Sequence, residues 1–369
     1  HCINGLIPFS YPGEMTGSLK IRGQETRDLS LFDISKTVGT VLQDSDAQFV
    51  GLTVAEDIAF ALENDCVPQA ELIKTVKETA SAVSVGDHLH HAPNELSGGQ
   101  KQRVSLAGVM VDKVPILLFD EPLANLDPAT GKKSIALIDE IQKKTGATVI
   151  IIEHRLEDVL YRHVDRVILM ADGRIVSDTT PDELLSTDSL LQYGIREPLY
   201  LTALKYAGVK ITPEMHPDSL ENIVLFDSDI QKVTDWYREA EPEKQERKAE
   251  PLLSVSDVSF TYDNGFEALK NISFEVSKGE MISVVGTNGA GKSTLAKVIC
   301  GFLRPQKGTI AMFKTDGVHG KEDLSILSIK EIADHIGYVM QNPNQMISKA
   351  FIRDEVGLGL ELRGKNPQE

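Results

Sequence analysis

A glycine-rich run in the last third of the sequence has the residue types and spacing of a phosphate-binding loop. It follows the apolar run Met281–Val285 and precedes the helical run Leu295–Cys300. Glycines let backbone N–H groups turn inward and cradle phosphate oxygens, while a lysine adds positive charge and a serine hydroxyl can ligate Mg²⁺. A glycine-rich turn with an incidental lysine is the alternative, and both flanks disfavour it. The predicted nucleotide-binding residues are Gly286, Thr287, Asn288, Gly289, Ala290, Gly291, Lys292, Ser293 and Thr294, with Ser293 also a metal ligand.

A second anion-binding element is predicted where a helical run opens with Ser97, Gly98, Gly99 and Gln100. Ser97 can cap the helix, and the two glycines leave backbone N–H groups exposed to an anion. By itself this run is a weak signal, because many helix starts look similar.

Two adjacent carboxylates, Asp120 and Glu121, end the apolar run Ile116–Phe119. At the end of a strand, Asp120 is placed to hold Mg²⁺ directly or through water, and Glu121 is placed to polarise an attacking water. A capped strand end explains one such acid, but it explains a pair less well. Asp127 follows within one loop.

Single polar residues at other strand ends extend this set. Gln43 and Gln341 each end a short apolar run, and His154 follows the apolar run Thr148–Glu153. A lone Gln or His there is usually structural, but the repeated Gln and the order of the His after the acidic pair favour contact with metal, water or a γ-phosphate. Tyr262, upstream of the glycine-rich run, could stack on an adenine ring or simply pack in its strand.

Short β-branched runs alternate with amphipathic helical runs along the sequence, and the strands among them are expected to position these residues. That alternation predicts an α/β fold with a parallel core. Ligands of such sheets bind beyond the carboxyl ends of the strands, so the polar residues there should meet at one edge. The candidate strands are Ile116–Asp120, Thr148–Glu153, Arg166–Met170, Met281–Val285 and Ile336–Met340.

The sequence contains an internal repeat of long period. The run Gln43–Gln48 and the helix start Glu56–Leu62 are echoed by Gln341–Gln345 and Asp354–Leu360, 297 or 298 positions further on. His1 then corresponds to a position just past the glycine-rich loop of the second copy. We therefore expect the first copy to lack its beginning and the second copy to lack its end.

Two domains and a connecting element are predicted: a first domain at 1–204, a connecting element and charged linker at 205–250, and a second domain at 251–369. The run Arg238–Glu250 holds nine charged residues and no large apolar one, as solvated linkers do. The run Ser219–Tyr237 carries apolar residues at roughly helical spacing. It either caps the first domain or forms an ordered linker with one or two helices.

Composition limits the classes of function. The sequence has 38 Lys and Arg against 55 Asp and Glu, a net charge of −17 at pH 7. Phosphate backbones require surplus positive charge, so nucleic acid is not expected as the main partner. No run approaches the ~20 apolar residues of a membrane helix. Cys2, Cys66 and Cys300 lie far apart and lack metal-ligand spacing, which favours a reducing cytosol over a disulfide framework.

Taken in order, these motifs resemble an ATP-binding-cassette (ABC) ATPase, and the resemblance covers essentially the whole chain. It implies a P-loop NTPase sheet with a helical subdomain, in two incomplete copies, with ATP and Mg²⁺ as cofactors. The motifs that carry it are Leu96-Ser-Gly-Gly-Gln100, Ile116-Leu-Leu-Phe-Asp-Glu-Pro122, Leu126-Asp-Pro128 and the single His154.

The resemblance implies a role for each matching residue. Gly286–Thr294 is the Walker A loop, and Ser97–Gln100 is the signature that closes on a partner's ATP. Asp120 and Glu121 are the Walker B pair, with Glu121 the catalytic base and Asp120 a metal ligand. Asp127 lies in the D-loop and contacts ATP, and His154 is the catalytic switch histidine. Gln43 and Gln341 are the Q-loop residues, Gln43 acting in catalysis and Gln341 as a metal ligand.

The chain departs from the family pattern, since its first domain has no Walker A and its second has no signature, Walker B or switch histidine. We expect truncation rather than degeneration. The intact parent protein is then expected to hydrolyse ATP, and this chain to be inactive.

The stretch Gln43–Asn64, its repeat and the element Ile195–Tyr200 look similar to the tandem-fused ATPases of energy-coupling factor importers, which carry cobalt, vitamins and precursors such as hydroxymethylpyrimidine or thiamine. That resemblance implies head-to-tail pairing of the two ATPase domains and a peripheral position on the cytoplasmic face of the cell membrane. It also implies integral-membrane transport subunits whose coupling helices dock near the Q-loops. The residues expected near that groove are Phe49, Val50, Met346 and Ile347, with core packing as the alternative.

Two other classes of function compete. A soluble tandem cassette protein acting on ribosomes or translation factors would be expected to carry a longer, basic, helical linker, whereas acids outnumber bases in Arg238–Glu250. A DNA-repair or structural-maintenance ATPase would need long heptad coiled coils, and the sequence shows none.

Overall fold

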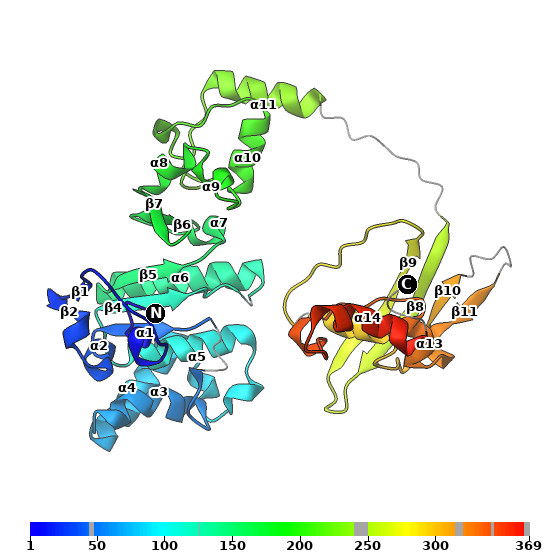
Figure 1. Cartoon of the computed structure of the whole chain (residues 1–369), viewed down its shortest axis with the longest axis horizontal. Coiled ribbons are helices and arrows are strands. Elements are labelled where there is room, and N and C mark those ends of the chain that lie inside the picture. The colour runs from blue at the N-terminus through cyan, green and yellow to red at the C-terminus, as the bar shows by residue number, and fades with distance from the viewer. Residues whose placement is uncertain (44–47, 125, 240–249, 314–319, 341–342, 365–369) are drawn as a thin grey trace. The chain divides into compact units, whose positions relative to one another are not determined.

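The computed structural model of the chain describes residues 1–369 apart from 44–47, 125, 240–249, 314–319, 341–342 and 365–369. It divides into two compact units, unit 1 at His1–Glu243 and unit 2 at Lys244–Glu369 (Figure 1). The domain limits predicted at 204 and 250 stay predictions.

Unit 1 is built on a parallel sheet of three strands in the order β3-β4-β5. The middle strand β4 buries Leu117, Leu118 and Phe119 in succession, with Leu118 in a different core cluster from its two neighbours. A run buried on both faces is typical of a central parallel strand. The predicted strand Ile116–Asp120 is confirmed, and Thr148–Glu153 is confirmed to within one residue. The bounds are β3 (Val38–Val41), β4 (Ile116–Asp120) and β5 (Thr148–Ile152).

Amphipathic helices cover the sheet, and α3, α4 and α5 gather on one side of it (Figure 1). Helix α3 shows why: Val54, Ile58, Ala59 and Leu62 recur at helical spacing and are buried, so one stripe faces the core. Among the described helices none is both long and apolar enough to cross a membrane. The bounds are α1 (Leu6–Phe9), β1 (Lys20–Ile21), β2 (Gln24–Glu25), α2 (Leu31–Ser35), α3 (Val54–Asn64), α4 (Gln69–Ala82), α5 (Gly98–Met110) and α6 (Pro128–Thr145).

The C-terminal part of unit 1 has a core of its own. The predicted strand Arg166–Met170 is shifted by one residue, and it was wrong to place it in the parallel sheet. It pairs antiparallel with β7, because Asp172 and Gly173 both take positive φ and close a tight hairpin. Met215 and Val209 are buried in this core. The bounds are α7 (Leu156–Val159), β6 (Val167–Ala171), β7 (Arg174–Thr179), α8 (Pro181–Leu185), α9 (Ser189–Gln192), α10 (Leu199–Tyr206) and α11 (Asp227–Glu239).

Unit 2 contains an antiparallel sheet in the order β11-β10-β8-β9 together with the α-helices α12, α13 and α14. Its core joins the sheet residues Val255, Val258 and Ile310 to Leu295 and Val298 of α12, so the helix after the glycine-rich loop is fixed by packing. The bounds are β8 (Pro251–Thr261), β9 (Glu267–Ser277), α12 (Lys292–Ile299), β10 (Lys307–Phe313), β11 (Lys321–Asp323), α13 (Ile329–Ala333) and α14 (Ile352–Leu362).

Two predicted strands of unit 2 were wrong, because Met281–Val285 and Ile336–Met340 pair with no other strand in the described chain. Met281 is 96% exposed and Val339 is 78% exposed. A strand is stable only beside a neighbour that accepts and donates its ladder hydrogen bonds. In unit 1 that neighbour of β3 is the acid-bearing strand β4, and the second copy contains no run like it.

Candidate functional site

The carboxyl edge of the parallel sheet brings three predicted residues together. Asp120 is the last residue of β4, Glu121 follows it, and Gln43 lies just beyond the end of β3. The Gln43 side-chain amide Nε2 donates to Glu121 Oε2 at 2.7 Å. Adjacent parallel strands end at the same edge, so a sequence separation of 78 residues becomes a direct hydrogen bond.

The backbone of Glu121 is turned sharply at this edge. Its φ is +46°, a left-handed conformation that non-glycine residues adopt rarely and that often marks a functional site. The Glu121 N–H still donates to the Ile152 carbonyl at 2.9 Å, which extends the β4–β5 ladder by one bond. The carboxylate is therefore carried on a backbone that the sheet holds in place.

Glu153 is a site residue that the sequence analysis missed. Its side chain is only 2% exposed, and its carboxylate accepts from the Leu123 N–H at 3.3 Å and the Arg155 N–H at 3.4 Å. Buried carboxylates need such partners. Glu153 thereby ties the loop after β4 to the loop after β5. The one feature of the sequence that could have identified Glu153 is that it is an acid directly before the predicted site residue His154.

His154 follows Glu153 but is exposed rather than buried. Its side chain is 66% exposed, and its Nδ1 lies 3.5 Å from Glu153 Oε1. The ring can therefore reach a ligand while its neighbour anchors the loop.

Asp127 is the N-cap residue of helix α6. Its carboxylate accepts from the Thr130 backbone N–H at 3.1 Å and from the Thr130 hydroxyl at 2.8 Å, as an N-cap does. Its contact with ATP stays a prediction.

The predicted anion-binding run opens helix α5 through a reciprocal cap. The Ser97 N–H donates to Gln100 Oε1 at 2.8 Å, and the Gln100 N–H donates to Ser97 Oγ at 3.4 Å. A Cβ on Gly98 would meet nothing within 4 Å, whereas one on Gly99 would lie 2.9 Å from Thr130 Cγ2. Gly98 thus faces open space, and Gly99 lets α5 approach the start of α6.

The glycine-rich loop of unit 2 precedes α12. Gly289 and Gly291 have φ of 82° and 89°, and a Cβ on Gly291 would lie 2.5 Å from the Ala268 carbonyl oxygen. Lys292 Nζ donates to the carbonyl oxygens of Gly286 at 2.7 Å and Thr287 at 2.8 Å. The loop therefore curls around the lysine ammonium, and its backbone requires glycine, which fits a cradle for phosphate groups.

Tyr262 contacts the same helix. Its hydroxyl lies 3.0 Å from Thr294 Oγ1, and its ring packs edge-on against Phe260 with 4.9 Å between centroids. These contacts link β8 to the start of α12. Adenine stacking by Tyr262 stays a prediction, and Gln341 lies outside the described residues.

The predicted metal ligands do not form a cage by themselves. In the described part of the chain, no group of three or more His, Cys, Asp or Glu side chains could hold a metal ion. Mg²⁺ is normally held by one or two protein oxygens together with nucleotide phosphates. Asp120 in unit 1 and Ser293 in unit 2 each carry an oxygen of the kind that Mg²⁺ prefers, and their roles as metal ligands stay predictions.

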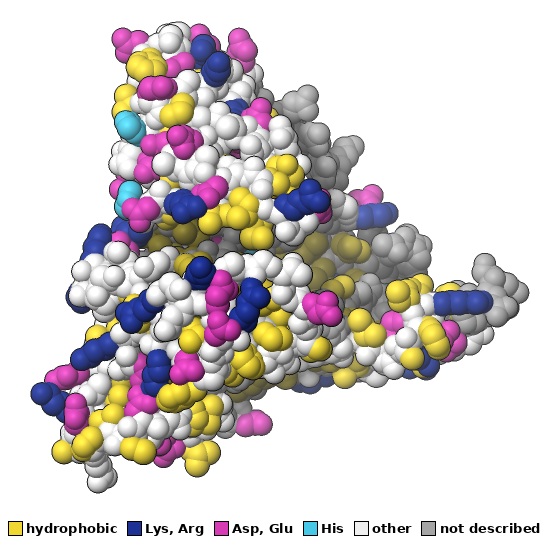
Figure 2. All heavy atoms as spheres, turned by 60° about the vertical axis from the view of Figure 1, so that its left-hand side comes forward, with side chains coloured by type: hydrophobic (Ala, Val, Ile, Leu, Met, Phe, Trp, Pro, Cys, Tyr) yellow, Lys and Arg dark blue, Asp and Glu magenta, His cyan; other side chains and the backbone are white. Residues whose placement is uncertain are grey.

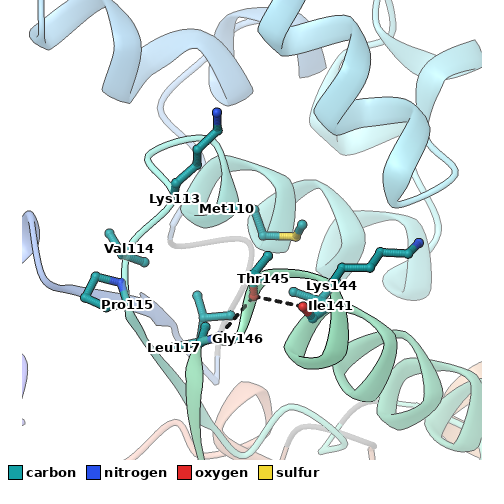
Figure 3. Close-up of a pocket in the computed structure, with 10 residues that line it drawn as sticks. Met110, Lys113, Val114, Pro115, Leu117, Ile141, Lys144, Thr145 and Gly146 are labelled. Carbon is teal, nitrogen blue, oxygen red and sulfur yellow. Dashed lines mark hydrogen bonds between the residues drawn. The ribbon is translucent and has the colours of Figure 1, made fainter.

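A cavity of about 420 Å³ lies at the opposite end of β4 (Figure 3). Leu117, Met110 and Ile141 give it an apolar lining, and the Thr145 hydroxyl donates to the Ile141 carbonyl at 2.8 Å. The side chains of its lysines extend away from Leu117 (Figure 3). A nucleotide site needs polar groups that converge, so this cavity is not the candidate site.

Comparison with known proteins agrees with the motifs. A family model described as ABC transporter matches residues 5–124 and 269–365, more than half of the chain. A second model, described as ATP-binding cassette cobalt transporter, matches residues 187–260.

Similar proteins are named as ABC transporter ATP-binding proteins. One from Clostridium perfringens (strain 13 / Type A) is 55% identical over 369 residues, which is 100% of this chain and 64% of that protein. One from Enterococcus faecalis (strain ATCC 700802 / V583) is 56% identical over 363 residues, 98% of this chain and 62% of that protein. The chain thus spans less than two thirds of the length of these curated relatives.

A solved structure, described as cbiO1 from Clostridium perfringens, part of the ABC transporter complex cbiONQ, is 30% identical and aligns with a TM-score of 0.41. The alignment covers 47% of this chain and 70% of that one. With two segments that match the family model over more than half of its length, the chain belongs to the ABC transporter family.

Proposed function

We propose that this chain is part of the ATP-hydrolysing motor of an ABC-type membrane importer of the energy-coupling factor type. The observation that carries the proposal is the hydrogen bond from Gln43 to Glu121 at the carboxyl edge of the sheet. A carboxylate held in this way, next to Asp120, supports the proposed role of Glu121 as general base for water.

Each candidate residue has a distinct task in this proposal. Bound Mg-ATP supplies the phosphoanhydride bond that is cleaved. In the site of unit 2, Lys292 and Ser293 hold phosphate and metal. In the separate site of unit 1, Glu121 accepts a proton from the attacking water, and Gln43 keeps the Glu121 carboxylate in place. His154 donates to the terminal phosphate. Phosphoryl transfer depends almost entirely on such positioning and electrostatic stabilisation.

The signature run Ser97–Gln100 is proposed to act when two cassette domains pair. Head-to-tail pairing of two cassette domains would place the N-terminus of α5, beginning at Ser97, against nucleotide held by the opposite domain. The exposed Ser97 and Gly98 support this proposal, because a helix N-terminus with outward N–H groups attracts phosphate.

Exposed apolar residues near the Q-loops support a membrane partner. Val50 is 64% exposed in unit 1, and Ile347 is 58% and Met346 is 40% exposed in unit 2. Phe49 instead packs against the core of unit 1. Apolar groups exposed at matching places in both copies suit docking helices of integral-membrane subunits. We propose that the protein lies peripherally on the cytoplasmic face of the membrane.

The transported solute is proposed to be a metal ion, with a vitamin or vitamin precursor as the second candidate. The support for a metal ion is the description of the model that matches residues 187–260, which names a cobalt transporter.

The surface also favours this proposal over ribosome binding. On the face shown in Figure 2, Lys and Arg side chains are interspersed with Asp and Glu rather than gathered into one basic patch, and nucleic-acid partners need such a patch. The test is affinity purification of the tagged chain from detergent-solubilised cells. Recovery of a multi-span membrane protein supports the importer, whereas recovery of ribosomal subunits would overturn it.

Residues 1–369 by themselves are proposed not to hydrolyse ATP at a useful rate. Lys292 and Glu121 belong to different copies of the cassette, so neither copy holds a full catalytic set. Phosphate release no faster than in Glu121→Gln is expected. A Mg²⁺-dependent rate that both Lys292→Ala and Glu121→Gln abolish would instead show that the two copies build one hybrid site.

A further inference from the structure

A histidine outside the recognised motifs contacts the last residue of the signature run. His88 ends the short turn Gly86–His88 between α4 and α5. Its Nε2 lies 2.8 Å from Nε2 of Gln100. Two nitrogens at this distance form a hydrogen bond only if one donates and the other accepts.

The helix cap decides which nitrogen donates. Gln100 Oε1 already accepts from the Ser97 N–H at 2.8 Å, so the amide NH₂ of Gln100 must face His88. Turning the amide over would set its NH₂ group against the Ser97 N–H, two donors without an acceptor. His88 Nε2 is therefore the acceptor, and the neutral ring carries its proton on Nδ1.

His88 is better anchored than the side chain that it contacts. Its N–H donates to the Val85 carbonyl at 3.0 Å, and its carbonyl accepts from the His91 N–H at 2.9 Å. Val85 is 1% exposed and belongs to the main core of unit 1. The His91 ring packs edge-on against His88 at 5.1 Å between centroids. Gln100 has three rotatable side-chain bonds, so a fixed acceptor removes much of its freedom.

The surroundings of the second ring nitrogen of His88 indicate that the orientation of the His88 ring is imposed by the protein. Its Nδ1 is buried and has no hydrogen-bond partner in the described chain. Leaving a buried donor unpaired is unfavourable. The arrangement persists because Nε2 is engaged by Gln100 and the backbone of the turn is fixed.

We infer that His88 is a positioning residue for the signature run. By accepting from Gln100 Nε2, it holds Gln100 Oε1 on the Ser97 N–H and keeps the first turn of α5 closed, with the backbone of Gly98 facing outward. This role is a property of unit 1 without nucleotide. Its consequence for ATP binding by an opposite cassette rests on the proposed function.

The first experiment measures amide hydrogen exchange of Ser97–Gln100 in the full chain without nucleotide. His88→Leu removes the acceptor and should speed exchange there about fivefold, the change expected for one neutral hydrogen bond. His88→Gln, which restores an acceptor at similar reach, should return exchange close to the original rate. His90→Leu replaces an exposed neighbour and should leave exchange unchanged.

The second experiment uses nitrogen-15 NMR of histidine-labelled chain, with the His88 signal assigned from its loss in His88→Gln. Expected are a protonated Nδ1 and an unprotonated Nε2. A protonated Nε2 would overturn the inference. So would unchanged amide exchange of Ser97–Gln100 in His88→Leu, provided that the amides of β4 remain protected and unit 1 is therefore still folded. If His88→Leu unfolds unit 1, the NMR result on the unaltered chain decides. Neither readout involves nucleotide, so failure here is distinct from failure of the proposed ATPase function.

Discussion

The side-chain amide of Gln43 and the carboxylate of Glu121 form a 2.7 Å hydrogen bond between the ends of two adjacent parallel strands. The donor is neutral, so it orients the carboxylate without the strong charge pairing that Lys or Arg would bring. Glu121 itself sits at φ +46°. A strained residue held by a specific partner indicates that the position of this carboxylate matters for function.

Replacing Glu121 by Gln is expected to slow hydrolysis by about 10²-fold or more, because a positioned base contributes at least that much to the rate. Nucleotide binding should persist, since the substitution keeps the size of the side chain. The measurement is phosphate release in an assembly that hydrolyses ATP, with the second site disabled by Lys292→Ala. Turnover within a few-fold of the unaltered protein would exclude Glu121 as the base.

The control for that experiment is Gln43→Leu, which removes the donor but leaves the carboxylate. Hydrolysis should fall less than in Glu121→Gln, by about tenfold, because one neutral hydrogen bond is worth roughly 1 kcal/mol. A loss as large as that of Glu121→Gln would show that Gln43 acts on the nucleotide or metal directly.

Replacing Lys292 by Ala is expected to weaken ATP binding by more than about tenfold, because the loop loses the ammonium that reaches the phosphates. In the structure that ammonium donates hydrogen bonds to the carbonyl oxygens of Gly286 and Thr287. Titration calorimetry of the full chain with Mg-ATP measures the effect. The matched control is Lys297→Ala on the same helix. Equal affinities in the two variants would remove the phosphate-loop assignment.

The parallel sheet and the helix cap of unit 1 could be predicted from sequence because their signals are local. Ile116–Asp120 is apolar along its whole length, and Ser97 stands three residues before Gln100. Strand β4 and the reciprocal Ser97–Gln100 cap follow directly from these patterns. The closeness of Gln43 and Glu121 could also be predicted, because adjacent parallel strands end at the same edge of a sheet.

Other features depend on neighbours that no local pattern reveals. Met281–Val285 has the composition of a strand, yet it finds no pairing partner among the described residues. Glu153 gives little sign in sequence, because its importance comes from the N–H of Leu123, 30 positions away. The bond between His88 and Gln100 depends in the same way on how the turn after α4 packs.

Removing the Glu153 carboxylate is expected to destabilise unit 1. Glu153→Ala leaves the N–H groups of Leu123 and Arg155 without their acceptor and should lower the free energy of unfolding by about 2–3 kcal/mol. Chemical denaturation followed by circular dichroism measures it. Glu140→Ala replaces an exposed acid on α6 and should change stability by less than about 0.5 kcal/mol. A similar, small effect of both substitutions would contradict the anchoring role of Glu153.

The two glycines of the signature run should respond oppositely to alanine. A Cβ on Gly98 meets open space, so Gly98→Ala should be neutral or stabilise unit 1 by up to about 1 kcal/mol. A Cβ on Gly99 would lie 2.9 Å from Thr130 Cγ2, and overpacking of this kind costs about 1–3 kcal/mol. The Thr130 methyl cannot turn aside, because its hydroxyl and its N–H are both bonded to Asp127. Thermal or urea unfolding of both variants measures the difference.

Thr130→Ser provides the decisive control, since it removes Cγ2 and keeps the hydroxyl that bonds to Asp127. In a double-mutant cycle, Gly99→Ala should cost at least about 1 kcal/mol less in the Thr130→Ser background than with threonine present, because the clash is then gone. Additive effects of the two substitutions would mean that the start of α6 can move away from α5. Gly99 would then be required for a reason other than this close approach.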